Sequence, residues 1–240
     1  MKTRSISRVF DVEQDLGYKN LVVGGCSFTY NINDLHSSQW PYYLRDLCNF
    51  DEVYDCSLPG AGNQQIATSI QWALETQAFD PKETLVIAMW SGHTRCGHFN
   101  NTPDPSFNFQ YNYAPDTWWN NDDPRTNPAL RSALSIENYL HVLNLKTYLT
   151  PYPHVFLDFV DYTIPNRSNS FDLTQYLPDV LANRYRNWFA PVENIYRFCV
   201  KNLLLDEDDF HPGVNGHLEW SRQVLAPYLI KNFTQYDGSL

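Results

Sequence analysis

The chain has 240 residues, 43% of them hydrophobic and 15% aromatic, which is enough to bury the core of one globular domain. Its 17 basic and 27 acidic residues give a formal net charge of -10, which repels nucleic acid and anionic membrane surfaces. No apolar run approaches the roughly eighteen residues of a membrane span, and no apolar stretch follows the basic residues at the N-terminus. We therefore expect a soluble cytoplasmic protein with neither nucleic acid nor a membrane as partner.

Five cysteines are scattered through the sequence without a CxxC pair. An odd number in this arrangement argues against a disulfide framework and against a zinc site. We predict reduced thiols, no metal ion and no other cofactor.

The segment Leu21 to Tyr30, LVVGGCSFTY, predicts a buried strand that ends in a turn carrying a serine. Leu21, Val22 and Val23 are typical of a central parallel strand, and two glycines let the backbone turn sharply at its carboxyl end. Ligands of open α/β sheets bind beyond the carboxyl ends of the strands, so Ser27 is placed to face a substrate. The alternative is a serine that only caps a turn, as serines commonly do.

Strands and helices alternate along the rest of the chain. Hydrophobic periodicity, glycines and prolines predict three further strands, at 53–56, at 84–90 in the middle of the sheet and at 154–160. The same signals predict helices at 39–48, 63–77, 131–149 and about 215 to 231, and a partly helical segment at 172–185. The first of these helices is predicted to be capped by Ser37 or Ser38 and to hold Pro41 in its first turn. Trp72 and Leu140 are predicted on the apolar sides of their helices, and segment 195–205 leaves its type open. This alternation predicts one doubly wound α/β domain over residues 1–240.

Residues from about 97 to 130 form a long insertion that is rich in Asn, Pro and aromatic residues and follows neither the helical nor the strand period. A structureless loop of this length in a compact domain is usually a lid or a binding loop. The alternative is a surface elaboration that packs its own aromatic side chains. Trp118 and Trp119 in this insertion could stack on a sugar ring or cover an acyl group.

Asp208 and His211 stand three residues apart near the C-terminus, in LLLDEDDFHPGVNGH. An aspartate at this spacing can accept a hydrogen bond from the imidazole, fix its tautomer and stabilise the imidazolium that forms in catalysis. A histidine held in this way beside Ser27 would take the hydroxyl proton as the serine attacks a carbonyl carbon. The alternative is a solvated acidic turn ahead of the final helix, where we expect His217 to be a surface or capping residue.

Three blocks of the chain together resemble the SGNH, or GDSL-type, hydrolases: GCSFT at 25–29, PGAGNQ at 59–64 and DDFHP at 208–212. The resemblance covers nearly the whole chain in order and implies a three-layer α/β/α, flavodoxin-like, mostly parallel fold. It also implies that Ser27 is the nucleophile and that Asp208 and His211 complete a triad. The oxyanion would be held by the backbone N–H groups of Ser27 and Gly62, or of Gly60 in place of Gly62.

The sequence departs from this family's pattern at two places. Cys26 stands where an aspartate usually precedes the serine, and we expect its thiol to pack inside. The third block, Trp90 to His93, lacks the asparagine that donates to the oxyanion, and losing one such donor costs on the order of 3 kcal/mol. The candidate substitutes are Asn63 first, then Ser91, His93 and Arg95. The residues predicted to contact substrate are Trp90, Ser91, Arg95, Trp118 and Trp119.

The predicted function is metal-free hydrolysis of a small acyl ester by a serine esterase. The resemblance and the aromatic insertion favour an acetyl group on a carbohydrate, so the expected partner is a small-molecule or glycan ester. Relatives with this GCSFT and HP layout are frequent in bacteriophages, which implies a viral setting, in the virion or the host cell, as a further expectation. A glycan-binding module with weakened catalysis and an acyltransferase that uses the same residues are the alternatives.

Overall fold

The computed structural model describes residues 14–30, 39–91, 95–99, 109–113, 128–157, 177–206 and 211–235. Its central sheet has four strands, all parallel, in the order β2-β1-β3-β6. These strands are β1 (Asn20–Gly24), β2 (Glu52–Asp55), β3 (Thr84–Met89) and β6 (His154–Leu157). β1 and β3 are the two inner strands and are buried almost throughout, as apolar strands with both faces covered are. The predicted strands are confirmed, except that 158–160 lies outside the described residues.

The chain reverses its direction of travel across the sheet at β1, which has β2 on one side and β3 on the other. In doubly wound sheets, ligands bind at such a reversal, beyond the carboxyl ends of the strands. β1 and β3 pair with Val23 opposite Ile87 and Gly24 opposite Ala88. The segments that leave these two strands therefore start side by side. We call this side of the sheet, where Ser27 and Ser91 follow β1 and β3, the carboxyl edge.

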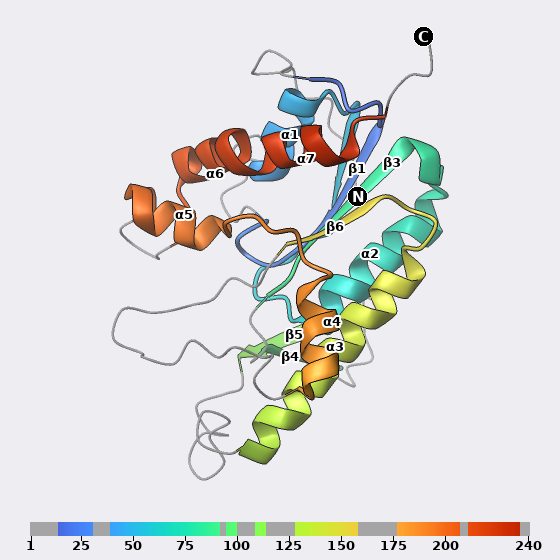
Figure 1. Ribbon diagram of the computed structural model, residues 1–240, viewed down its shortest axis with the longest axis vertical. Helices are drawn as coiled ribbons and strands as arrows, with labels where there is room; N and C mark the ends of the chain where they lie inside the picture. The colour runs from blue at the N-terminus through green and yellow to red at the C-terminus, as the bar shows by residue number, and fades with distance from the viewer. Residues whose placement is uncertain are drawn as a thin grey trace.

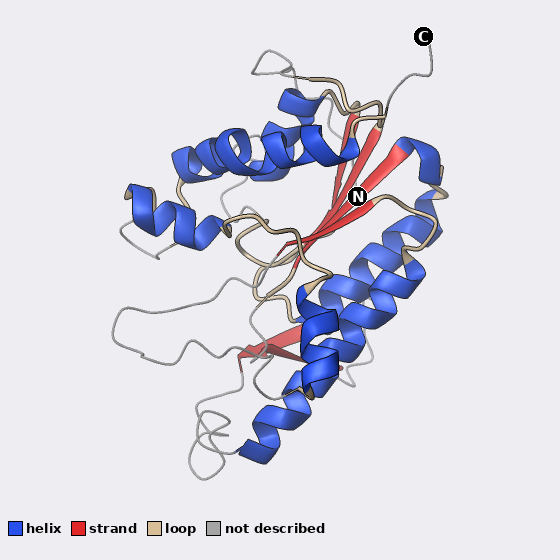
Figure 2. Ribbon diagram, viewed as in Figure 1, coloured by secondary structure: helices blue, strands red, loops and turns tan. Residues whose placement is uncertain are grey.

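Helices cover both faces of the sheet (Figures 1 and 2). One face carries α1 (Trp40–Cys48), α6 (Val214–Trp220) and α7 (Ala226–Phe233), and the other carries α2 (Asn63–Gln77) and α3 (Pro128–Tyr148). The chain also forms α4 (Asp179–Arg186), α5 (Ile195–Asn202) and a 3-10 turn at Pro81–Glu83. The predicted three-layer α/β/α fold is confirmed. Across the described ranges, no helix combines the length and apolar character needed to cross a membrane.

The two helices on the α2 face match their predicted spans, but each exposes one side chain that was predicted on its apolar side. α2 buries Ile66, Ile70 and Leu74, whereas Trp72 is 55% exposed. Residue 72 lies about 200° around the helix from residue 70, so it faces away from the sheet. Leu140 of α3 is 53% exposed and lies about 200° around its helix from the buried Val142. Both predictions are wrong.

The final helical run extends from Val214 to Phe233 and contains a π turn, Ser221–Leu225, between α6 and α7. Pro227 lies in the first turn of α7, where a proline removes one backbone hydrogen bond and clashes with the carbonyl four residues earlier. The wider π turn accommodates both effects. The extent predicted for this helix is confirmed, but the helix is not uniform.

The remaining helices differ from prediction mainly at their ends. α1 begins after Gln39, whose side chain makes no capping hydrogen bond, and the predicted caps Ser37 and Ser38 lie outside the described residues. α4 lies in the second half of the predicted segment 172–185, of which 172–176 lies outside the described residues, and α5 shows that 195–205 begins as a helix.

A β-hairpin lies within the insertion that was predicted to lack regular structure. β4 (Arg95–Phe99) and β5 (Phe109–Tyr113) pair antiparallel. The sequence of β5, FQYNY, alternates aromatic and polar residues, which is the period of a strand. The surrounding Asn and Pro residues masked this short signal, so the prediction is wrong here. Trp118 and Trp119 lie outside the described residues.

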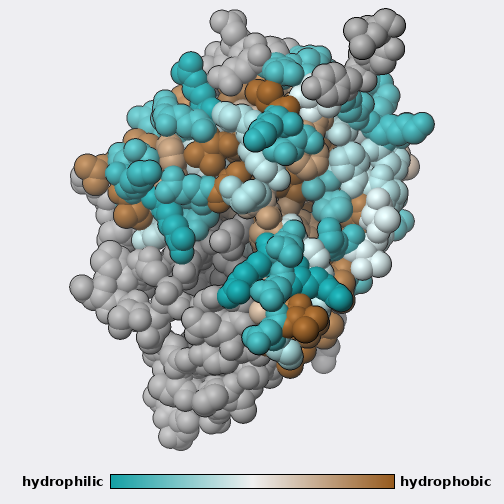
Figure 3. Space-filling view, in the orientation of Figure 1, coloured by the Kyte–Doolittle hydropathy of each residue, from teal (hydrophilic) through white to brown (hydrophobic). Residues whose placement is uncertain are grey.

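Exposed hydrophobic side chains lie where α5 ends and α6 begins. Leu203 is 90% exposed, and Val200 and Val214 are about half exposed. Figure 3 shows hydrophobic surface at this α5 end of the molecule. Leu203 ends α5 with a positive φ of 55°, and the chain then runs through a bridge that pairs Leu205 with Pro212. Pro212 of this bridge directly follows His211 in the sequence.

Candidate active site

Ser27 lies on a tight turn directly beyond β1, at the carboxyl edge. The N–H groups of Thr29 and Tyr30 both donate to the carbonyl of Cys26, at 2.8 and 2.9 Å. A Cβ at Gly25 would lie 2.1 Å from Thr29 Oγ1, so only glycine fits the inner side of this turn. The thiol of Cys26 is fully buried in the core, as predicted, while Ser27 stays half-buried. The turn therefore directs the thiol inward and leaves the hydroxyl accessible.

His211 reaches this turn from the far end of the chain. Its Nε2 lies 2.9 Å from Ser27 Oγ. The imidazole packs against the ring of Phe28, with centroids 4.8 Å apart. Its backbone is held by the N–H of Asp206, which donates to the His211 carbonyl at 2.8 Å, and by the adjacent bridge of Leu205 with Pro212. The structure thus brings Ser27 and His211 together, whereas Asp208 lies outside the described residues.

The loop after β2 approaches the serine turn and contains both candidate oxyanion glycines. The N–H of Leu58 donates to the carbonyl of Gly25 at 3.1 Å, which ties this loop to the turn. Gly60 is half-buried and has a φ of 73°, in the region that favours glycine. Gly62 is buried, has an ordinary φ of -84° and is the N-cap of α2, which no side chain caps. Within the described residues, the N–H groups of Ser27, Gly60 and Gly62 have no hydrogen-bond acceptor.

Asp55 orders the start of the same loop. Its Oδ1 accepts hydrogen bonds from the N–H of Ser57, at 2.9 Å, and from the Ser57 hydroxyl. Burial raises the pKa of Asp55 from its ordinary value of 3.8 to about 6, although both hydrogen bonds from Ser57 act in the opposite direction. A carboxylate close to the turn that carries Ser27 is therefore held in an environment that disfavours its charge.

Asn63 joins the loop after β2 to the end of β3. Its Oδ1 accepts from the N–H of Ser91 at 2.8 Å, and its Nδ2 donates to Oδ1 of Asn138, in α3, at 2.5 Å. Asn63 and Asn138 are 1% and 4% exposed. Asn138 was not predicted, yet the sequence contains a signal for it. It shares a helical stripe with Val142, Leu145 and Leu149, where a polar residue needs a buried partner.

The substrate-contacting residues predicted near β3 are largely enclosed. Trp90 and Ser91 are both 0% exposed, and the Trp90 ring packs edge-on against Phe156 at 5.4 Å. Neither Trp90 Nε1 nor Ser91 Oγ has a hydrogen-bond partner in the described part of the chain. Side chains without exposed surface can contact a substrate only if their neighbours move. Arg95 begins β4, and its role stays a prediction, as do those of Trp118 and Trp119.

His217 is buried rather than at the surface. It lies in α6 and is 6% exposed, so the predicted surface or capping position is wrong. Its position in the helix places it on the same inner side as Trp220, which the sequence reading overlooked. Burial, followed by the nearby charge of His211, lowers the pKa of His217 to about 3. This imidazole is therefore neutral at physiological pH. No three His, Cys, Asp or Glu side chains in the described ranges could together hold a metal ion.

Solved structures share this fold. A G-D-S-L family protein from Desulfitobacterium hafniense DCB-2 is 13% identical and covers 88% of this chain and 99% of its own, with a TM-score of 0.53. The psychrotrophic esterase EstA from Pseudoalteromonas sp. is 12% identical, and the match covers 89% of this chain and 97% of the EstA chain, with a TM-score of 0.52. TesA is 13% identical, and the match covers 88% of this chain and 97% of the TesA chain, with a TM-score of 0.51. No family model and no curated protein matches the sequence. The fold expected from the SGNH resemblance is confirmed.

Proposed function

We propose that this SGNH-fold chain is a serine hydrolase that cleaves a small acyl ester. The observation that carries the proposal is the 2.9 Å contact between Ser27 Oγ and His211 Nε2, made across 184 residues of sequence at the carboxyl edge. A nucleophile and a base within hydrogen-bond reach are the minimum requirement for acyl transfer through a covalent intermediate. The similar structure EstA is an esterase, which favours an ester over an amide.

The chemistry follows from this contact in two steps. Ser27 Oγ attacks the ester carbonyl carbon while its proton passes to His211 Nε2, and the carbonyl oxygen becomes an oxyanion. The oxyanion collapses, the carbon–oxygen bond to the leaving group breaks, and His211 donates the proton to the departing alcohol. Water then attacks the acyl-serine and gives its proton to His211, and Ser27 regains a proton as the carboxylic acid leaves. Asp208 is proposed to accept a hydrogen bond from Nδ1–H of His211, which keeps Nε2 unprotonated and ready to receive the serine proton.

The oxyanion requires donors that no protein group already occupies. The N–H of Ser27 meets this condition within the described residues, and so do those of Gly60 and Gly62. Gly62 is the donor expected from the sequence, but Gly60 is the more exposed of the two, which favours it as the N–H that a substrate oxygen reaches. The uncapped N-terminus of α2 adds a positive potential at this point. Asn63 retains one Nδ2 hydrogen beyond its bond to Asn138 and is proposed as the substitute for the missing amide; because the residue is 1% exposed, its neighbours must move for this hydrogen to reach the oxyanion.

The proposed substrate is an acetyl ester on a carbohydrate. Its support is the resemblance to enzymes that remove acetyl groups, together with the aromatic residues of the insertion, of which Trp118 and Trp119 are the proposed sugar contacts. Release of acetate from acetylated oligosaccharides, compared with hydrolysis of longer-chain p-nitrophenyl esters, tests this choice. Preferred hydrolysis of the longer esters would exclude it, and an acetylated acceptor glycan as product would identify an acyltransferase.

The serine mechanism is tested with p-nitrophenyl acetate and the Ser27→Ala variant. We expect kcat/KM to fall at least about a thousandfold, because removal of the nucleophile leaves only binding and oxyanion stabilisation. Thr76→Ala, at an exposed hydroxyl near the far end of α2, is the matched control and should retain full activity. An organophosphonate probe should add one phosphonyl group to the wild type and none to Ser27→Ala. Equal hydrolysis by wild type and Ser27→Ala would contradict the proposal, and glycan binding without turnover would favour the binding module.

A further inference from the structure

We propose that Asn138 is a positioning residue that holds the loops after β2 and β3 in register with Ser27. It acts through the Asn63 amide, and the inference rests on the proposed function. Asn138 comes from α3 and meets a residue 75 positions earlier in the sequence. No described contact of Asn138 involves Ser27 or His211 directly.

The Asn63 amide is fixed at both ends. A backbone N–H can only donate, so the atom that faces the Ser91 N–H must be the Asn63 oxygen. The Asn63 nitrogen is then directed at Asn138, whose oxygen accepts at 2.5 Å. With both ends held, the plane of the amide is fixed, and so is the direction of its remaining hydrogen. Because Asn63 is 1% exposed, water cannot replace either partner.

The Asn63 amide and the Leu58 N–H together connect the three segments that meet at the carboxyl edge. Leu58 ties the loop after β2 to the serine turn through the Gly25 carbonyl. Asn63 ties the other end of that loop to Ser91, beyond β3. Asn138 anchors the junction to α3, which packs along α2 on the same face of the sheet. The loop that carries Gly60 and Gly62 is therefore held from both sides.

The Asn63 side chain reaches out of its own helix. Asn63 is the first residue of α2, directly after the N-cap Gly62, and its amide bonds to the Ser91 N–H beyond β3 and to Asn138 in α3. Since a misplacement of about 1 Å in an active site can cost about a hundredfold in rate, the contact that holds this amide should appear in kcat.

The test uses two substitutions of Asn138, one that removes the oxygen accepting from Asn63 and one that keeps an oxygen at that place. Asn138→Leu keeps the branching of the side chain at Cγ and removes the oxygen, and we expect kcat on p-nitrophenyl acetate to fall about 10- to 100-fold, with KM changed less than about threefold. Asn138→Asp keeps an oxygen for Asn63 Nδ2 and should stay within about threefold of the wild-type kcat. Asn138→Ala replaces the leucine variant if that variant does not fold. The control is Asn20→Ala, which removes an asparagine bond to Thr84 at the opposite edge of the sheet and should leave kcat unchanged.

A double variant separates positioning from general stability. If Asn138 acts through Asn63, Asn63→Ala combined with Asn138→Leu should be no slower than Asn63→Ala alone by more than about twofold. A role in stability alone would lower the melting temperature of Asn138→Leu and leave kcat within twofold of wild type, which would overturn the inference. Equal loss in the leucine and aspartate variants would overturn it too. If Ser27→Ala is as active as wild type, the proposed function fails first and this inference fails with it.

Discussion

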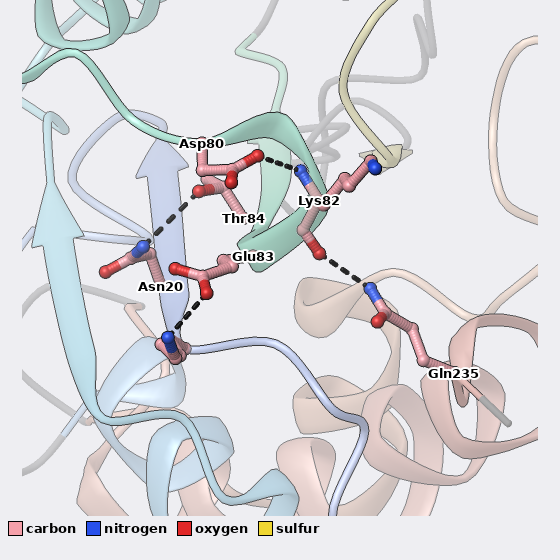
Figure 4. Close-up of polar contacts among 7 residues, drawn as sticks. Asn20, Asp80, Lys82, Glu83, Thr84 and Gln235 are labelled. Atoms are coloured by element: carbon pink, nitrogen blue, oxygen red, sulfur yellow. Dashed lines mark hydrogen bonds and ion pairs between the residues drawn. The ribbon is translucent and has the colours of Figure 1, made fainter. Parts of the chain in front are cut away.

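The two edges of the central sheet use polar groups in opposite ways. At the edge where the strands begin, which we call the amino edge, side chains pair with close neighbours: Lys19 with Glu83, Asn20 with Thr84, and Asp80 with the N–H of Lys82 (Figure 4). Gln235, the last described residue, is joined to this edge by donating to the Lys82 carbonyl at 2.8 Å. These contacts close the structure around the two ends of the described chain.

The carboxyl edge instead keeps donors open. There the N–H groups of Ser27, Gly60 and Gly62 have no acceptor among the described residues, while a buried amide pair, Asn63 with Asn138, holds the backbone that presents them. Buried polar groups are normally paired because an unpaired group costs about 1–3 kcal/mol. An edge that leaves backbone donors open and fixes their support is therefore suited to bind a developing negative charge. Under the proposed function, catalysis would depend on the carboxyl edge and closure of the fold on the amino edge.

The difference between the two edges is tested first by one Gly→Ala substitution at each edge, and the largest effect is expected at the carboxyl edge. Gly25→Ala would place a methyl group 2.1 Å from Thr29 Oγ1 and 2.7 Å from Thr29 Cβ, so a change of rotamer cannot relieve the clash. We expect a loss of about 3 kcal/mol in the free energy of unfolding and a fall in kcat of at least about tenfold. Urea denaturation and p-nitrophenyl acetate kinetics measure the two effects.

Gly17→Ala is the control at the amino edge. Gly17 has a φ of 82°, and an added Cβ would lie 3.0 Å from Gln235 Cβ, so this substitution should cost about 1–2 kcal/mol. Its kcat should match that of the wild type in the folded protein. Equal loss of kcat in both variants would show that activity follows overall stability rather than the shape of the carboxyl edge.

The sequence predicts the layers of this fold well because its signals are local. β1 and β3 are short apolar runs, and α2 is bounded by a glycine-rich loop before it and by Pro81 after it. The hairpin of β4 and β5 was missed because five-residue strands between Asn- and Pro-rich segments carry a weak signal. Trp72 was misplaced because tryptophan is typical of a core position, although residue 72 lies about 200° around the helix from the buried residue 70.

The site was predicted in part, and the parts that were missed depend on tertiary contacts. Ser27 and His211 are each marked by their own local motif, and the structure brings them together. The link from Asn63 to Asn138 joins two helices, and no local pattern says which buried asparagine meets which. The burial of His217 also depends on how α6 packs, which a sequence reading of the turn before it cannot show.

A smaller effect, on the free energy of unfolding, is expected when the charge of Asp55 at the carboxyl edge is removed. Because the pKa of Asp55 is raised from 3.8 to about 6, the folded state binds its proton more tightly than the unfolded state. The associated stability is fully present below about pH 4 and is lost as the pH rises through about 6. Asp55→Asn keeps an acceptor for Ser57 without the charge, so it should be more stable than the wild type above pH 6, by about 2 kcal/mol.

The measurement for Asp55 is the free energy of unfolding of both proteins between pH 4 and pH 8. The two curves should meet near pH 4 and separate as the pH rises. A difference that stays constant with pH would show that the fold does not disfavour the charged form of Asp55. The two edges would then not differ in how they affect a carboxylate.

The smallest effect is expected at the amino edge, from Glu83→Gln. Lys19 and Glu83 are 58% and 41% exposed, and water screens such pairs strongly. The hydrogen bond from Lys19 to Glu83 and the charge of that carboxylate raise the pKa of Lys19, so the ion pair persists until well above neutral pH. Even so, we expect the melting temperature to change by no more than about 2 °C and the change to shrink further in about 0.5 M salt. kcat on p-nitrophenyl acetate should not change. A fall in kcat would mean that the amino edge is coupled to Ser27 through β1 or β3, and the division of roles between the two edges would have to be abandoned.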